Sequence, residues 1–197
     1  MVCFLNYGHK HLKFKNMKHI VILILSFFLV GAVSAQEEKL SKKERRKMER
    51  QAEAEQKYVR TGELLDSMKF VLEADYLNNQ RGHRVIVPTS LNFIKVDANS
   101  AVLQVGRNTG TGSNGVGGTT AEGEISRYDV NKNEKKKTYD VRMNVNTNIG
   151  NYDVFMSVAY DGSARATISG VYPGKLTWEG DIVSLDDSRV YQGRTSY

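Results

Sequence analysis

Residues 139–146 read YDVRMNVN, and residues 152–160 read YDVFMSVAY. In each stretch a large apolar side chain stands at every second position, beginning with Tyr139 and Tyr152. Successive side chains of a strand point to opposite faces, so this period of two predicts strands with one buried face. The turn between the two stretches is too short for a parallel crossover, which favours an antiparallel hairpin.

Similar short segments continue on both sides of this hairpin. They cover residues 70–76, 91–96, 101–105, 119–130, 164–170 and 176–182. Turn sequences separate several of them, among them Asp97–Ser100, the polar stretch Asn131–Lys136 and Asp161–Gly162. Because the connections are short, the sequence predicts a mainly β fold: an antiparallel up-and-down meander of seven to eight strands. Either a curved sheet or a lipocalin-like barrel fits this prediction.

A charged helix is predicted ahead of these strands. Residues 36–66 contain no proline and only one glycine, Gly62, and they are rich in Glu, Lys, Arg, Gln and Ala, which favour helices. Glu53 and Lys57 form a favourable pair one helical turn apart. The basic run at residues 42–47 could contact anionic lipid headgroups, but acidic residues interrupt it and no apolar face lies behind it. A solvated helix or linker is the alternative.

The first 35 residues have the features of a signal peptide. Residues 20–30 are apolar except for Ser26, lysines precede them, and Val33 and Ala35 fit the small-x-small cleavage pattern. The apolar run is shorter than the roughly 20 residues of a membrane-spanning helix. We therefore expect translation to start at Met17, cleavage near Ala35, and a periplasmic or secreted product.

The predicted organisation is a signal peptide at 1–35, a charged helix or linker at 36–66 and a β-domain at 67–197. Cleavage removes four lysines and no acidic residue, so the formal net charge falls from +6 to +2. A nearly neutral exported domain is not expected to bind nucleic acid.

Cleavage also limits the chemistry that the domain can perform. The single cysteine, Cys3, leaves with the leader, and His83 is the one histidine that remains. Neither a disulfide nor a cysteine nucleophile is then available. One histidine without a cysteine or second histidine is a poor basis for a metal site. We therefore predict no catalytic residue, no cofactor and no metal site.

Several of these segments together resemble a known family. They are FVLEA at 70–74, the turn at 97–100, a glycine-rich middle, SARATIS at 163–169 and LTWEG at 176–180. This pattern is similar to domain-of-unknown-function family 4251, small exported proteins of Gram-negative bacteria, over roughly residues 62–183. The resemblance implies a β fold and an envelope location, and it favours a strand at 69–76. It implies no known activity, catalytic residue or ligand.

Residues 110–115 match the pattern G-x-G-x-x-G. A dinucleotide site needs such a loop to begin a helix, because the helix N-terminus holds the pyrophosphate. Here Gly117, Gly118 and two threonines follow, which cannot start a strong helix. The sequence therefore predicts a loop between strands rather than a nucleotide site.

Two pairs of carboxylates offer an enzymatic alternative. Glu122 and Glu124, like Glu179 and Asp181, lie two residues apart in predicted strands. Such residues share a face at a spacing of about 6.6 Å, which overlaps the roughly 6.5–9.5 Å of inverting glycosidases. These pairs are also common on solvated sheet faces. A carboxylate-based envelope hydrolase is therefore the alternative to a domain without catalytic activity.

Aromatic side chains are the best candidates for ligand contact. Alternation places Tyr139, Tyr152 and Tyr160 in the core, whereas Trp178 and Tyr172 are the residues we expect to contact a ligand. The sequence favours an exported, non-enzymatic binding or scaffolding module of the cell envelope. Its expected partner is an envelope protein, a glycan or a small apolar ligand.

Overall fold

The computed structural model describes residues 41–109, 112–170 and 175–197. The chain divides into two compact units, residues 1–46 and residues 47–197. The described part of the first unit, residues 41–46, forms the start of helix α2 (Lys42–Ser67). The second unit contains the rest of α2 and every strand.

The charged helix of the prediction is helix α2. Its N-terminus is capped by a reciprocal pair: the Glu44 amide donates to Ser41 Oγ at 3.3 Å, and the Ser41 amide donates to Glu44 Oε2 at 2.8 Å. The expected Glu53–Lys57 ion pair forms, with 3.0 Å between Oε1 and Nζ. Exposed residues dominate the helix until its last turns.

Within the described residues, nine strands follow the helix. They are β1 (Lys69–Asn78), β2 (Arg84–Ile86), β3 (Phe93–Asp97), β4 (Ser100–Val105), β5 (Thr119–Asn133), β6 (Thr138–Thr147), β7 (Gly150–Ala159), β8 (Ser163–Ser169) and β9 (Lys175–Ser184). A short 3-10 turn, η2 (Thr89–Leu91), lies between β2 and β3.

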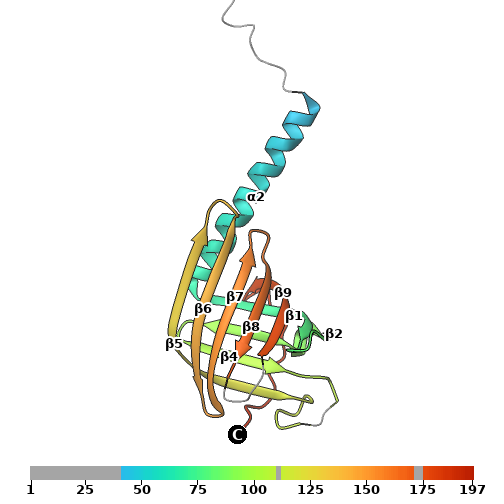
Figure 1. The fold of residues 1–197 in the computed structure, drawn as a ribbon, viewed down its shortest axis with the longest axis vertical. Helices are drawn as coiled ribbons and strands as arrows, with labels where there is room; N and C mark the ends of the chain where they lie inside the picture. The colour runs from blue at the N-terminus through green and yellow to red at the C-terminus, as the bar shows by residue number, and fades with distance from the viewer. Residues whose placement is uncertain (1–40, 110–111, 171–174) are drawn as a thin grey trace, which may run out of the picture. The chain divides into compact units, whose positions relative to one another are not determined.

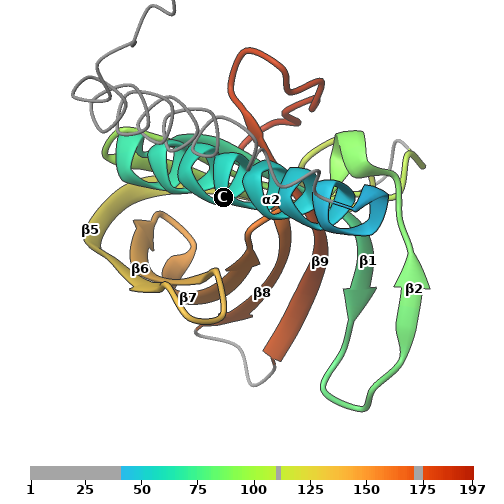
Figure 2. The same ribbon diagram turned by 90° about the horizontal axis from the view of Figure 1, so that it is seen from above.

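The strands form a closed antiparallel barrel. From β3 to β9 each strand pairs with the next, β1 pairs with β3, and β1 also pairs with β9 to close the ring. Eight strands therefore make the barrel, and β2 is an extra strand along the second half of β1. Figure 1 shows β5 to β8 side by side, and in Figure 2 the wall curves from β5 round to β1, with β2 beyond it. The predicted antiparallel meander is confirmed, in its barrel form.

Two details differ from the sequence prediction. Strand β2 was not expected, because three exposed residues, Arg84 to Ile86, are too few to show alternation. Strand β5 runs to Asn133, so the first half of the predicted turn at Asn131–Lys136 belongs to a strand. The extra strand length pairs with β6, where Lys132 lies opposite Tyr139.

Glycines allow the wall to bend where strand registers shift. A Cβ atom at Gly180 would lie 1.9 Å from the Glu73 carbonyl oxygen, near the shift between Ala74 and Tyr76. A Cβ atom at Gly123 would lie 2.0 Å from the Asn146 carbonyl oxygen, near a second register shift in β5. Bulges of this kind increase twist and curvature, which closing a small barrel requires.

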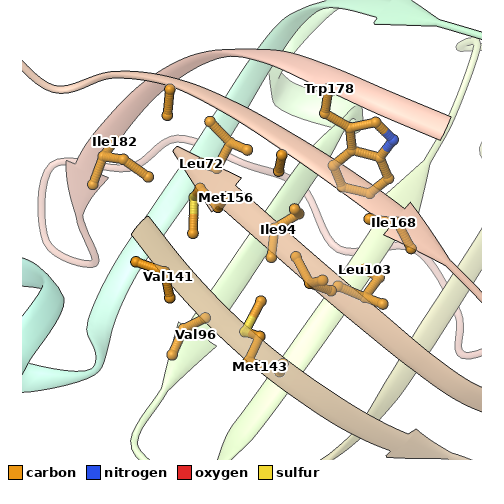
Figure 3. Close-up of a cluster of buried hydrophobic side chains, with 14 of the residues drawn as sticks. Leu72, Ile94, Val96, Leu103, Val141, Met143, Met156, Ile168, Trp178 and Ile182 are labelled. Atoms are coloured by element: carbon orange, nitrogen blue, oxygen red, sulfur yellow. The ribbon is translucent and has the colours of Figure 1, made fainter. Parts of the chain in front are cut away.

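Apolar side chains from all eight barrel strands fill the interior (Figure 3). They include Leu72, Ile94, Val96, Leu103, Ala121, Val141, Met143, Met156, Ile168, Trp178 and Ile182. Full burial of one large aliphatic side chain stabilises a fold by about 1.5–3 kcal/mol. A second, smaller cluster is formed by Val71, Phe93 and Val102, which alternate with inward-facing residues. The C-terminal segment covers this second cluster through Leu185 and Val190.

The last turns of α2 pack against one end of the barrel. Tyr139 of β6 donates a hydrogen bond to the Tyr58 carbonyl at 2.7 Å, and the two rings stack with 4.7 Å between centroids. Tyr128 of β5 donates to the Leu65 carbonyl at 2.7 Å. Burial raises the pKa of both Tyr128 and Tyr139, so both remain neutral donors. The helix thus closes the end at which β1 begins.

Candidate functional site

A cavity of about 490 Å³ lies at the other end of the barrel. Most of its wall is apolar: Leu103, Val105, Ala121, Ile149, Ile168, Leu176 and the rings of Tyr152 and Trp178. Its polar side chains are Ser113, Thr119, Lys175, Ser196 and the terminal Tyr197. This volume falls within the range of about 300–1,000 Å³ that is typical of ligand pockets.

Strand direction brings these residues together. Strands β4 and β8 end at the cavity, whereas β5 and β9 begin there, and the β6–β7 turn contributes Ile149. Helix α2 contacts the opposite ends of β5 and β6. Gly170 follows β8, and a Cβ atom there would lie 2.6 Å from the ring of Tyr152. The absence of a side chain at Gly170 therefore lets the Tyr152 ring pack beside it at the cavity wall.

The loop between β4 and β5 is organised by one buried side chain, Asn114. Its amide nitrogen donates to the Val105 carbonyl at 3.1 Å and to Thr120 Oγ1 at 3.2 Å. Its amide oxygen accepts from the backbone of Val116 at 3.1 Å and of Gly118 at 2.9 Å. All the polar capacity of a buried amide is used, which fixes the loop at the cavity rim.

The C-terminal segment forms another part of the cavity wall. Ser196 is 4% exposed and pairs with Thr120 through two hydrogen bonds, one from each backbone amide, of 2.9 and 3.2 Å. Asn148 donates to the Ser196 carbonyl at 2.8 Å, and the hydroxyl groups of Ser113 and Ser196 are 2.7 Å apart. The chain end is thereby attached to β5, to the β4–β5 loop and to the β6–β7 turn.

The charge and polarity of the cavity are asymmetric. Of the described lining residues, Lys175 is the one with a charged side chain, and none is an Asp or a Glu. Trp178 is 2% exposed, and its indole N–H has no hydrogen-bond acceptor among the described residues. The cavity can therefore hold a mostly apolar molecule, and it presents donor groups rather than anionic ones.

Comparison with known proteins places this barrel in a family. The model of the family described as Domain of unknown function (DUF4251) matches residues 52–182, which run from the middle of α2 into β9. The chain belongs to the DUF4251 family. The resemblance expected over residues 62–183 is thus confirmed, and the match extends ten residues further into the helix.

A solved structure shares the fold. It is the crystal structure of a DUF4251 family protein from Bacteroides eggerthii, with a TM-score of 0.57 and 24% sequence identity. The similarity covers 67% of this chain and 90% of that chain. The search of curated proteins found no match. The comparisons therefore give the fold and the family of this DUF4251 protein.

The predicted ligand contacts of the DUF4251 chain have different outcomes. Trp178 lies in the cavity wall, and Tyr172 lies outside the described residues. Of the tyrosines predicted to be buried, Tyr139 is in the core, Tyr152 lines the cavity, and Tyr160 is 37% exposed. The prediction for Tyr160 was wrong because β7 ends at Ala159 and alternation does not continue into the turn.

The predicted carboxylate pairs of the DUF4251 barrel do not line the cavity. Glu122 accepts hydrogen bonds from Gln192 and Thr195, which help to hold the C-terminal segment. Glu124 is exposed on the same strand. These side chains lie on the outer face of the barrel, since Ala121 between β4 and β6 faces inward.

Glu179 and Asp181 lie in a separate open groove on the outer face of β1, β8 and β9. Hydrogen bonds from Arg165, together with those from Arg84, lower the pKa of Glu179. Asp181 is exposed, but partial desolvation raises its pKa, as do the neighbouring charges of Asp75, Asp161 and Glu73. One carboxylate is thus held in its ionised form while the other binds a proton more readily.

The remaining candidates carry no site within the described residues. His83 is exposed, and its backbone amide donates to Asn79 Oδ1 at 3.0 Å. No group of three potential metal ligands occurs in the part of the chain that the structure describes. Strand β5, not a helix, follows the G-x-G-x-x-G loop. Among the described helices, none combines the length and hydropathy that a membrane span needs.

Sequence reasoning missed several cavity residues. Ile149 belongs to a turn, and Lys175 and Ser196 are polar, so no alternation pattern marked them. Leu103 and Ala121 were identifiable in principle, because alternation within β4 and β5 places them on the inner face.

The basic run at 42–47 forms the exposed start of α2.

Proposed function

We propose that this DUF4251 protein is an exported, non-enzymatic module that binds a small, mostly apolar molecule in its cavity. The observation that carries the proposal is the cavity of about 490 Å³, lined mainly by apolar side chains, in a barrel that is otherwise filled. Eight-stranded barrels are just wide enough to hold one small ligand. No Asp or Glu side chain is among the described lining residues, which argues for binding rather than acid–base chemistry.

Export is part of this proposal and rests on the leader at residues 1–35. We expect the natural host, or a Gram-negative expression host, to release a protein whose N-terminus is Gln36. N-terminal sequencing of the periplasmic fraction tests this expectation. A full-length chain that begins at Met1 or Met17 and stays in the cytosol would contradict it.

Ligand binding can be tested with N-phenyl-1-naphthylamine, a neutral dye that brightens in apolar surroundings. We expect the wild-type protein to bind the dye with a saturable fluorescence increase. Leu176→Trp, which places a large ring at the cavity wall, is expected to weaken binding at least tenfold. Phe155→Trp is the matched control, because Phe155 is 43% exposed on the outer face.

Two results would contradict ligand binding at this site. The first is a wild-type protein that binds neither the dye nor any apolar molecule from an envelope extract, as measured by native mass spectrometry. The second is equal dye affinity for the Leu176→Trp and Phe155→Trp variants. An envelope protein that co-purifies in stoichiometric amount would instead favour the scaffolding alternative.

A second candidate function is hydrolysis by Glu179 and Asp181. Carboxylates whose pKa values are displaced in opposite directions can divide acid and base roles, and these two lie in one groove. However, Glu179 already forms ion pairs with two arginine side chains, Arg84 and Arg165. Turnover of envelope glycans that disappears in Glu179→Gln and persists in Glu124→Gln would favour the hydrolase.

A further inference from the structure

Trp178 has a feature that its role in the core does not explain. Its side chain is 2% exposed, and its Nε1–H has no acceptor among the described residues. A buried N–H without a partner is unfavourable, because it has lost its hydrogen bonds to water. Only one other described side chain, Tyr58, has a buried polar atom in this condition. Tyr58 lies in α2, at the end of the barrel that the helix covers, whereas Trp178 lines the cavity at the opposite end.

Trp178 lines the cavity, but its nitrogen is buried in this conformation, so a ligand can meet it only after a shift of the ring. In Figure 3 the nitrogen lies on the side of the ring that faces away from Leu72 and Met156, which fill the middle of the barrel. Strand β9 begins at Lys175 and continues inward, so Trp178 stands three residues further along the strand. That distance is about 10 Å at the usual rise per residue of a strand.

The surroundings of Trp178 restrict what can accept its hydrogen bond. Ile168 and Leu176 also line the cavity, and the one charged side chain among the described lining residues is that of Lys175 at the start of β9. An ionised carboxylate beside Trp178 would lose its hydration without a cation at the same depth, which is costly. A neutral oxygen has a much smaller desolvation cost and satisfies the indole N–H.

We propose that the ligand of this cavity is an apolar molecule that carries a neutral acceptor, a carbonyl or hydroxyl oxygen, and that this oxygen accepts a hydrogen bond from Trp178 Nε1–H. This inference rests on the proposed function, since it names the ligand class of the same cavity. Trp178 is a binding residue in this role, and the apolar wall holds the rest of the molecule.

The test uses two probes of nearly equal shape, acetophenone and isopropylbenzene. They differ in that the first has a carbonyl oxygen where the second has a methyl group. Trp178 is the single tryptophan of the chain, so one indole cross-peak reports on it in a ¹⁵N–¹H correlation spectrum. Both probes carry the same phenyl ring, so the difference between their effects isolates the carbonyl group.

We expect both probes to bind, and only acetophenone to shift the indole proton strongly downfield. This measurement needs no variant and does not depend on how a substitution affects folding. Trp178→Phe keeps an aromatic ring and removes the donor. It is expected to weaken acetophenone binding about fivefold more than isopropylbenzene binding, as the loss of one neutral hydrogen bond predicts. Phe155→Leu on the outer face is the control.

The outcomes separate this inference from the proposed function. If both probes bind, move the indole proton equally and lose affinity equally in Trp178→Phe, the inference is wrong and the apolar cavity remains a binding site. That result would also indicate that water, or another part of the chain, already satisfies the indole. If neither probe binds at its solubility limit, and the naphthylamine dye also fails to bind, both proposals are wrong.

Discussion

Gly62 is the position in helix α2 where the barrel leaves no room for a side chain. A Cβ atom there would lie 2.5 Å from the hydroxyl oxygen of Tyr139, whose ring is held by stacking on Tyr58. In an exposed helix, Gly→Ala stabilises by up to about 1 kcal/mol. Here we expect Gly62→Ala to destabilise the protein by about 1–3 kcal/mol through overpacking, as measured by urea unfolding.

A double-mutant cycle gives the control for Gly62→Ala. Tyr139→Phe removes the atom that the new methyl group would meet, so the cost of Gly62→Ala is expected to be smaller in that background. Ala substitution of the exposed helical residue Glu63 is expected to change stability by less than about 0.5 kcal/mol. A Gly62→Ala protein as stable as the wild type would contradict the close packing described above.

Asp181 is a residue whose charge opposes folding. Because partial desolvation and the neighbouring carboxylates raise its pKa above the usual 3.8, the folded state binds a proton at Asp181 more tightly than the unfolded state does. We therefore expect Asp181→Asn to raise the free energy of unfolding at pH 7 by about 0.2–1 kcal/mol. The gain should shrink as the pH falls through the raised pKa, and disappear below 3.8.

Urea unfolding at several pH values between 3 and 7 measures this effect. Asp186→Asn, in the exposed turn after β9, is the matched control and should change little. A gain for Asp181→Asn that is independent of pH would show that charge repulsion is not its cause.

At the scale of elements, Glu179 connects three strands. From β9 it accepts hydrogen bonds from Arg165 of β8 and from Arg84 of β2, whose Nε lies 3.0 Å from Oε2. Arg84 also stacks over the Tyr76 ring, 3.4 Å from its centroid. Since β2 pairs with β1 alone among the described strands, this contact fixes the extra strand to the barrel.

We expect Glu179→Gln to accelerate amide hydrogen exchange in β2. We also expect it to lower the free energy of unfolding at pH 7 by only about 1 kcal/mol, because both arginine side chains are more than half exposed and their ion pairs are screened by water. The pKa of Glu179 is lowered, so its contribution is present above the usual 4.5 and is lost as the pH falls through the lowered value. The stability difference between wild type and variant should therefore narrow below pH 4.5. Unchanged exchange in β2, with Glu124→Gln as the control, would contradict this role.

The strands were predictable to different degrees for a physical reason. Strands such as β6 and β7 have one face in the core and one in water, so their sequences alternate and reveal them. Strand β2 is exposed at all three residues and carries no such pattern. Closure of the barrel was not readable either, because it depends on pairing between β1 and β9, which are far apart in sequence.

At the scale of the whole molecule, the cavity should couple ligand binding to global stability. Its wall includes residues from β4, β5, β7, β8 and β9, so a ligand that leaves on unfolding stabilises most of the barrel at once. At a ligand concentration one hundred times the Kd, the gain is about 2.7 kcal/mol. For a unit of this size we expect a rise of Tm of roughly 5–10 °C.

Differential scanning fluorimetry with acetophenone tests this coupling. Leu176→Trp is expected to show little or no rise of Tm, whereas Phe155→Trp should behave like the wild type. An unchanged Tm at a concentration that saturates the indole NMR shift would contradict coupling between the site and the fold.

The candidate site was predictable only in part. Trp178 could be selected from the sequence because it is a large aromatic residue in the last predicted strand. Its unpaired N–H could not, since that depends on what surrounds the ring in three dimensions. The wall contributed by Ser196 was equally hidden, because the C-terminal segment reaches the cavity through long-range hydrogen bonds rather than through a periodic pattern.

The tyrosines that join α2 to β5 and β6 have a consequence for kinetics. Tyr58, Tyr128 and Tyr139 fill the end of the barrel against which α2 packs. A ligand must therefore enter and leave the cavity through the opposite end. A second ligand can then bind only after the first has dissociated. The rate of ligand exchange should therefore equal the dissociation rate of the bound ligand and should not depend on the concentration of competitor.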